Sequence, residues 1–199
     1  MRDTSRDEID TEERARAFME QLRWPDGVRC PRCDATRGIS RIGTRGQFDC
    51  DTCNYQFSVR AGTVLHGSRL PLSKWVLAVY LMTESADGIS ANLLGQTLGV
   101  SYKTAWFLTH RIRIAMRGEA GRLLTTEPHG DGIAQQRMAL LRRSVAKTHR
   151  RPGEKHLTAY LDEAAFRIRN RNNDRRFHDT LVRLLQADAM PYAELSSSG

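Results

Sequence analysis

The first apolar pattern along the chain lies at residues 11–23, TEERARAFMEQLR, and has helical spacing. Its apolar face comprises Ala15, Phe18, Met19 and Leu22. Pro25 and Gly27 end the pattern, because both residue types disfavour a continuing helix. The runs FDC and YQFSV follow, and their aromatic and β-branched residues predict short paired strands. We therefore expect a short amphipathic helix that packs on a small sheet.

A second helical pattern follows the strands, in the run LPLSKWVLAVYLM. Its apolar stripe comprises Trp75, Val76, Val79 and Tyr80. Ser73 precedes this stripe, and serine is a favoured N-cap because its hydroxyl accepts a hydrogen bond from an unpaired backbone N–H. The sequence therefore predicts a helix that is capped by Ser73.

Two more helices are predicted in the run GISANLLGQTLGVSYKTAWFLTHRIRIAM. Ser90 is a candidate cap for a helix that ends near Leu98, and GVS then forms a tight turn. A longer helix runs from Tyr102 to about Met116. Its inward-facing residues are Trp106, Leu108, Ile112 and Met116. The pattern is typical of a helix-turn-helix, although an ordinary helical hairpin has the same spacing and stays open as an alternative.

The second helix of a helix-turn-helix enters the major groove of DNA, where its first residues meet the base edges. This arrangement predicts which residues of the chain would contact DNA. The candidates are Ser101, Tyr102, Lys103 and Thr104, with Arg111 and Arg113 facing phosphates or solvent.

The last third of the chain is helical in pattern, after a stretch at residues 118–132 that we expect to be a linker because it is rich in Gly, Thr and charge. The apolar stripes comprise Ala134, Met138, Leu141 and Val145, then Leu157, Tyr160, Leu161, Ala164, Ala165 and Ile168, then Phe177, Leu181, Leu184 and Leu185. This pattern predicts a loosely attached helical tail without a central sheet, and a frayed end at SSSG.

All four cysteines of the chain lie in two Cys-x-x-Cys pairs, in VRCPRCDAT and FDCDTCNYQF. Such pairs at this spacing are typical of a tetrahedral zinc site, because a two-residue gap lets one turn aim both thiolates at one ion. We therefore expect zinc as the cofactor. The expected ligands are Cys30, Cys33, Cys50 and Cys53. A redox pair and four unligated structural cysteines are the alternatives.

The composition favours a polyanionic partner, since 31 Lys and Arg face 23 Asp and Glu and the sequence pI is about 9.8. A solvated basic face would have the same balance. The same two alternatives apply to the basic tract Arg142, Arg143, Lys147, Arg150 and Arg151. His149 and His156 are candidate spare metal ligands. The charged start of the chain lacks an export signal and no apolar run is long enough to span a bilayer, so we expect a cytoplasmic protein without a membrane partner.

At this point the chain resembles the bacterial insertion-sequence transposases that carry an N-terminal zinc ribbon before a DD(E/N) catalytic domain, the insertion-sequence family numbered fifteen-ninety-five. The resemblance is carried by LRWPDGVRCPRC, by FSVRAGTVLHGSRLPLSKWVLAVYLM and by the helix pair described above. It covers roughly residues 11–117. A second block, LLRRSVAKTHRRPGEKHLTAYLDEAAFRIRNR, resembles the end of that family's catalytic domain.

The resemblance implies a mainly α chain with a small β zinc ribbon, which ends in a helical remnant of an RNase-H-like domain. The domains expected are 1–27 for the N-terminal helix, 28–60 for the ribbon, 61–117 for the helix-turn-helix, 118–132 for the linker and 133–199 for the remnant.

Most of the catalytic domain implied by the family lies between the two blocks and is missing here. In the family, three carboxylates hold two metal ions for phosphoryl transfer. The position of the last carboxylate falls on Gln135, and an amide binds a hard divalent cation poorly. Asp131 is either a remnant of the first aspartate or a chance acidic residue in a polar stretch. Asp162 and Glu163 match non-catalytic positions, which we expect to form a solvated face.

Three functions follow. The first is a shortened transposase that binds double-stranded DNA sequence-specifically without chemistry, as a transposon-end binder or a transcription regulator. The second is an interaction module, in which the C-terminal helices bind an intact transposase or a second copy of this chain. The third is an active transposase or nuclease, with carboxylates supplied by Asp131, Asp162 and Glu163.

Overall fold

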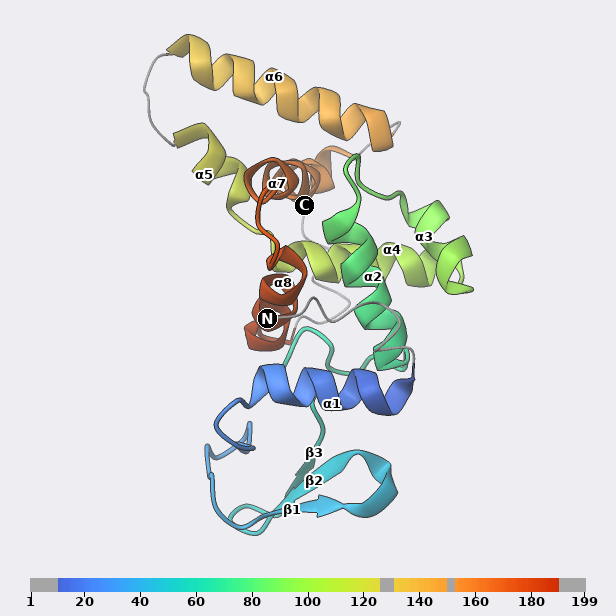
Figure 1. Cartoon of the computed structure of the whole chain (residues 1–199), viewed down its shortest axis with the longest axis vertical. Coiled ribbons are helices and arrows are strands. Elements are labelled where there is room, and N and C mark those ends of the chain that lie inside the picture. The colour runs from blue at the N-terminus through green and yellow to red at the C-terminus, as the bar shows by residue number, and fades with distance from the viewer. Residues whose placement is uncertain (1–10, 126–130, 150–152, 190–199) are drawn as a thin grey trace. The chain divides into compact units, whose positions relative to one another are not determined.

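The computed structural model describes residues 11–125, 131–149 and 153–189, with the backbone alone at Thr44 and Asp131. Helices dominate these residues, and one three-stranded antiparallel sheet accompanies them (Figure 1). The expected mainly α class with a small β ribbon is therefore confirmed. Within the described ranges, none of the helices is both long and apolar enough to cross a lipid bilayer.

The chain divides into two compact units, and the boundaries fall inside α2 and α8. The first unit reaches Leu77 and adds Leu181–Met190, and the second contains Ala78–Thr180. The elements are α1 (Glu12–Arg23), β1 (Ile39–Ile42), η2 (Gly43–Arg45), β2 (Gln47–Cys50), β3 (Tyr55–Phe57), α2 (Leu72–Glu84), α3 (Ala91–Leu98), α4 (Tyr102–Ile114), α5 (Glu119–Thr125), α6 (Asp131–Thr148), η3 (Glu154–His156), α7 (Leu157–Arg169) and α8 (Arg176–Gln186).

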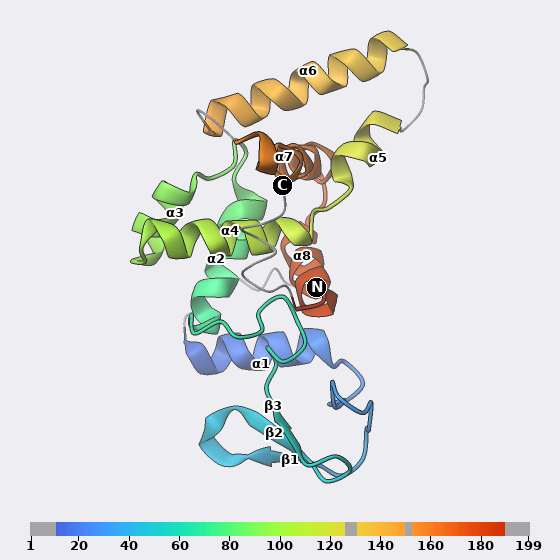
Figure 2. The same cartoon turned by 180° about the vertical axis from the view of Figure 1, so that it is seen from behind.

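Helix α1 packs on the ribbon as the sequence predicts, and Figure 2 shows it beside the three strands. Ala15 and Met19 on its apolar face are fully buried. At the end of the helix, the guanidinium of Arg23 donates to the carbonyls of Val59 (2.8 Å) and Ala61 (2.7 Å). These bonds hold the segment that follows β3 against α1.

The start of α2 departs from the sequence prediction that Ser73 caps this helix. The helix begins at Leu72, and the carboxylate of Glu12 accepts from the backbone N–H of Leu72 (2.9 Å) and of Ser73 (3.1 Å). The cap is therefore supplied by a residue sixty positions earlier, and a negative side chain there also suits the positive end of the helix dipole. Glu12 forms an ion pair with Arg60 as well (3.2 Å).

We predict that Glu12→Ala lowers the free energy of unfolding of the first unit by about 1 kcal/mol, the usual effect of removing a helix cap. Glu13→Ala, at the exposed neighbouring position, is the matched control and should leave stability unchanged. Urea denaturation followed by circular dichroism measures both. Equal stability of the two variants would contradict the capping role.

In the second unit, α3 begins at its predicted cap, Ser90, and α4 begins at a second serine cap, Ser101, which the sequence pattern predicts only as part of the turn and as a DNA contact. Ser90 accepts from the N–H of Leu93 and Ser101 accepts from the N–H of Thr104, each at 3.2 Å. Gly99 ends α3 with φ +60, a left-handed conformation that glycine adopts without strain. Helix α4 ends at Ile114, slightly before the predicted end.

The remaining helices do not form the linker and loosely attached tail that the sequence predicts. Helix α5 lies inside the expected linker at 118–132, and α7 contacts α4, α5 and α6 (Figures 1 and 2). The core shared by α5, α6 and α7 comprises Ala120, Leu141, Val145, Ala164 and Ala165. The glycines around α5 hide it in the sequence, whereas packing on α7 stabilises it.

A buried ion-pair network also joins these helices and corrects the expectation that Asp162 and Glu163 form a solvated face. The guanidinium of Arg113 donates to Glu163 at 2.7 Å, with side chains only 2% and 1% exposed, and Arg167 donates to the same carboxylate. Asp162 accepts from the backbone N–H of Ala120 at 2.9 Å. Both acids are thus structural contacts between helices.

The pKa of Glu163 adds a dependence on pH. Burial raises this pKa, but Arg113 and Arg167 together hold it below its ordinary value. Because the folded-state pKa is depressed, the stability that Glu163 contributes is present above its unfolded pKa of about 4.3 and is lost as the pH falls through the folded value.

We predict that Glu163→Gln lowers the free energy of unfolding of the second unit by about 3–5 kcal/mol at pH 7, because it leaves two buried arginines without their carboxylate. The difference from wild type should shrink as the pH falls below about 4. Glu154→Gln, on the exposed η3, is the matched control. A pH-independent difference in thermal unfolding would contradict the ion-pair explanation.

Candidate metal centre and nucleic-acid interface

The first Cys-x-x-Cys pair forms a tight knuckle. The N–H of Asp34 donates to the carbonyl of Cys30 and the N–H of Cys30 donates to the carbonyl of Ala35, each at 3.0 Å. Asp34 adopts φ +62, in the left-handed region that aspartate and asparagine tolerate better than most residues. The chain therefore reverses directly after Cys33.

The second pair repeats this geometry. The N–H of Asn54 donates to the carbonyl of Cys50 at 2.8 Å, and Asn54 has φ +53. Cys50, at the end of β2, is paired with Tyr55 at the start of β3. The position after each pair is thus occupied by Asp or Asn, a signal of the left-handed turn that the pair spacing alone does not reveal.

The two knuckles bring all four sulfurs together. The Sγ atoms of Cys30 and Cys53 are 3.7 Å apart, as are those of Cys33 and Cys50, and all four lie within 4.8 Å of one another. A tetrahedral ion with Zn–S bonds of about 2.3 Å would separate its sulfurs by roughly 3.8 Å. The structure therefore brings the four predicted residues together at the spacing that a zinc ion requires.

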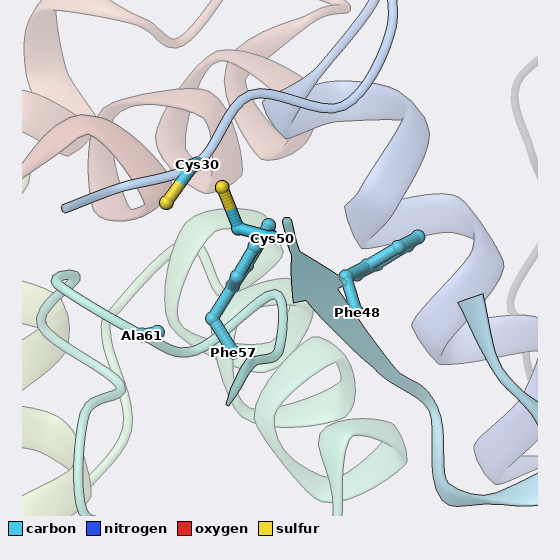
Figure 3. Close-up of a cluster of buried hydrophobic side chains, with 5 residues drawn as sticks. All are labelled: Cys30, Phe48, Cys50, Phe57 and Ala61. Atoms are coloured by element: carbon cyan, nitrogen blue, oxygen red, sulfur yellow. The ribbon is translucent and has the colours of Figure 1, made fainter. Parts of the chain in front are cut away.

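An apolar cluster lies directly under the sulfurs (Figure 3). Cys30 and Cys50 are fully buried against Phe57 and Ala61, with Phe48 in the same cluster. The edge of Trp24 contacts the Phe48 and Phe57 rings, with centroids 5.5 and 5.9 Å away. The cluster excludes water from one side of the site.

The thiols of the site differ in acidity. Burial and the neighbouring thiols raise the pKa of Cys53 to about 12. Burial also acts to raise the pKa of Cys50, but hydrogen bonds from the N–H groups of Cys53 and Thr52 lower it to about 7. Since a zinc ligand must be a thiolate, an ion that binds here has to displace protons.

At the other candidate site, Tyr102 and Lys103 lie exposed at the N-terminal end of α4, with Tyr102 61% exposed. The hydroxyl of Ser101 caps the helix and lies 2.9 Å from the hydroxyl of Thr104. Ser101 and Thr104 therefore have a role in the helix start itself, and the more accessible side chains are those of Tyr102 and Lys103.

The two predicted arginines of α4 are less accessible. Arg111 is half-buried, and burial lowers its pKa. The prediction that Arg113 faces phosphates or solvent is wrong, because its guanidinium is buried against Glu163. The alternation of arginines in the sequence does not reveal that the second one faces a carboxylate fifty positions later.

Helix α3 adds exposed side chains that the sequence reasoning missed. Asn92 and Gln96 are exposed, and Leu93 is 53% exposed. The sequence feature that could have predicted this exposed surface is the pair of polar residues Asn92 and Gln96 on the side of the helix opposite the apolar Leu94. Gly95 on the buried face permits close approach of α4, since a Cβ there would lie 3.3 Å from the Cβ of Ala105, and 3.2 Å from the carbonyl oxygen of Val100 in the turn.

Some predicted residues lie outside the described part of the chain, namely the side chain of Asp131, Arg150, Arg151 and the terminal SSSG. His149 and His156 contact Tyr160 and Trp106 respectively. Across the described ranges, the four cysteines form the one group of three or more metal-ligating side chains within reach of a common ion.

Two cysteine knuckles on a three-stranded sheet define a zinc-ribbon protein. Residues 10–56 match the transposase zinc-ribbon domain. The chain is also 36% identical to an uncharacterized protein in transposable element ISH50 of Halobacterium salinarum, over 53% of this chain and 36% of the relative. These matches confirm the resemblance to insertion-sequence transposases, and this relative is archaeal. The chain thus spans about a third of the relative's length. No solved structure is detectably similar.

We predict that the purified chain contains one zinc ion and that its removal by a chelator unfolds residues 28–57, because so small a core cannot fold without the metal. Cys50→Ser should lose the zinc and the dispersed amide NMR signals of the ribbon. Thr52→Ala, at an exposed position of the same knuckle, should keep both. A native ribbon spectrum from the metal-free protein would contradict the prediction.

Proposed function

We propose that the chain is a zinc-dependent, sequence-specific DNA-binding protein derived from a transposase, without strand-cleavage chemistry of its own. It would act as a transposon-end binder or a transcription regulator. Zinc held by the four cysteines orders the ribbon, and α3 with α4 reads the DNA as a helix-turn-helix.

The observation that carries this proposal is the geometry of α3 and α4. A short turn closed by Gly99 joins them, and the first turn of α4 presents Tyr102 and Lys103 outward. A lysine ammonium can donate to acceptors on guanine edges or to phosphates, and the tyrosine adds an apolar ring with a hydroxyl. The exposed Asn92 and Gln96 of α3 supply further hydrogen-bond donors for the phosphate backbone of the DNA.

The electrostatics support a polyanionic partner. The formal net charge is +8, and several acids of the second unit are already paired with arginines, among them Glu119, Glu163 and Glu84. The pair of Glu84 with Arg176 is neutral, whereas Glu119 and Glu163 are each shared by two arginines, so each of these two sets keeps one positive charge of the excess. This excess favours association with DNA at low salt.

The absence of cleavage chemistry is proposed from what the candidate carboxylates do. Glu163 neutralises two arginines, and Asp162 accepts a backbone hydrogen bond, so both side chains serve structural contacts. Gln135 stands at the family's last carboxylate position. A two-metal mechanism needs carboxylates that are directed at the ions.

The structure of the second unit gives the interaction-module alternative less support than the sequence does. That alternative requires apolar faces on the C-terminal helices that nothing covers. Leu141, Val145 and Ala165 instead pack together in one core. The exposed Leu140 of α6 is the feature that favours this alternative.

The test is a selection of bound duplexes from a random pool at physiological salt. We expect wild type to enrich a motif, and Lys103→Glu to weaken binding to that motif by about 10–100-fold, the usual effect of losing one good base contact. Arg69→Glu, an exposed residue with the same charge change in the first unit, is the control.

The outcomes separate the candidates. Enrichment that is lost in Lys103→Glu and kept in Arg69→Glu supports sequence-specific reading by α4. Equal weakening by both variants would show that only net charge matters. No enrichment by folded, zinc-loaded wild type would overturn the proposal and favour an interaction module.

A further inference from the structure

A cavity of about 350 Å³ lies in the second unit, between the C-terminal half of α4 and the beginning of α7. Its lining includes His110, Arg113, Arg117, Lys155, His156 and Asp162. It is within the size range of small-molecule sites. It is distinct from the exposed end of α4, since His110 lies eight positions after Tyr102 along the helix, or about 12 Å.

The charge of this cavity is positive. Arg113 shares the carboxylate of Glu163 with Arg167, so two guanidinium groups face one acid. Asp162, the acid that lines the cavity, accepts the N–H of Ala120 at 2.9 Å. Arg117 and Lys155 line the cavity and are exposed, so a ligand that enters from solvent can contact their charged ends.

A cluster of rings, tilted to one another by 41–74°, lies beside these cations. The imidazole centroids of His110 and His156 are 4.6 Å apart, and the Trp106 ring lies 4.1 Å from His110. Burial, with Arg113 and the neighbouring histidines, lowers the pKa of His110 to about 3. The imidazole is therefore neutral at pH 7, so it can accept or donate a hydrogen bond.

A metal site is a poorer explanation of the histidines. Among the residues that the structure describes, they do not join a group of three ligating atoms within reach of one ion. Guanidinium and ammonium groups at the same cavity would also repel a cation. Their chemistry suits an oxyanion, since arginine offers a planar set of donors and lysine a compact charge.

We propose that this cavity binds a nucleotide phosphate, with Arg117 and Lys155 on the phosphate oxygens and His110 and His156 beside them. The phosphate comes either from a free nucleotide or from the terminal nucleotide of a DNA strand. Binding of a free nucleotide is independent of the proposed function, whereas binding of a DNA end rests on it.

The experiment uses the full, zinc-loaded chain and follows the imidazole carbon-bound proton signals of the six histidines by NMR. Sodium phosphate, thymidine 5′-monophosphate, and a short DNA strand with or without a 5′-phosphate are titrated separately at constant ionic strength. We expect saturable shifts at His110 and His156, with the other histidines unmoved. Arg117→Gln with Lys155→Gln should weaken binding by about tenfold or more, as expected for the loss of charge-assisted hydrogen bonds.

Arg142→Gln with Arg143→Gln is the matched control, because it removes two exposed charges from α6 instead. Tighter binding of the nucleotide than of phosphate assigns the free nucleotide, and a requirement for the 5′-phosphorylated strand assigns the DNA end. Non-saturable shifts, or equal weakening by the control pair, would overturn the proposal.

The outcome is separable from that of DNA reading by α4. Lys103→Glu should keep the phosphate titration even where it loses duplex selection. Dispersed histidine signals in each variant show that the second unit is folded, so weakened binding cannot be mistaken for unfolding.

Discussion

The small apolar core of the ribbon is the constraint on which the rest of the first unit depends. The four cysteine thiols beside that core can add stability by binding one ion. The buried cluster of the ribbon holds two cysteines, two phenylalanines and one alanine. A core of this size leaves little stability after the chain entropy is subtracted. The sulfurs lie at tetrahedral spacing, so an ion there would convert four repelling thiolates into a crosslink between two knuckles.

The rest of the first unit is attached to this small core by polar contacts from α1. Arg23 donates to the carbonyls that follow β3, and Glu20 pairs with Arg41 on β1 at 2.5 Å. At the other end of α1, Glu12 caps α2. One helix therefore transmits order from the ribbon to the start of α2, and loss of the ribbon would remove the surface against which α1 packs.

What the sequence predicts well is local. Cys30 and Cys50 reveal their knuckles through pair spacing, and Ser90 reveals its cap, since each depends on neighbours within a few residues. Ser73 fails as a cap because Glu12 satisfies those N–H groups from sixty positions away. Glu163 and Arg113 likewise look like surface charges, because periodicity does not show which distant residue will face them.

Contacts between residues that are far apart in the sequence also change how the positive charge of the chain should be interpreted. An internal pair such as Arg113 with Glu163 removes one charge of each sign from the surface and leaves the net charge of +8 unchanged. Every such pair therefore raises the ratio of positive to negative groups among the residues that remain exposed. Those residues include Lys103 at the start of α4, and Arg117 and Lys155 at the cavity. The second unit thus uses its acids to hold its helices together, which leaves its exposed charges mainly positive and suits the phosphate-bearing partner that we propose.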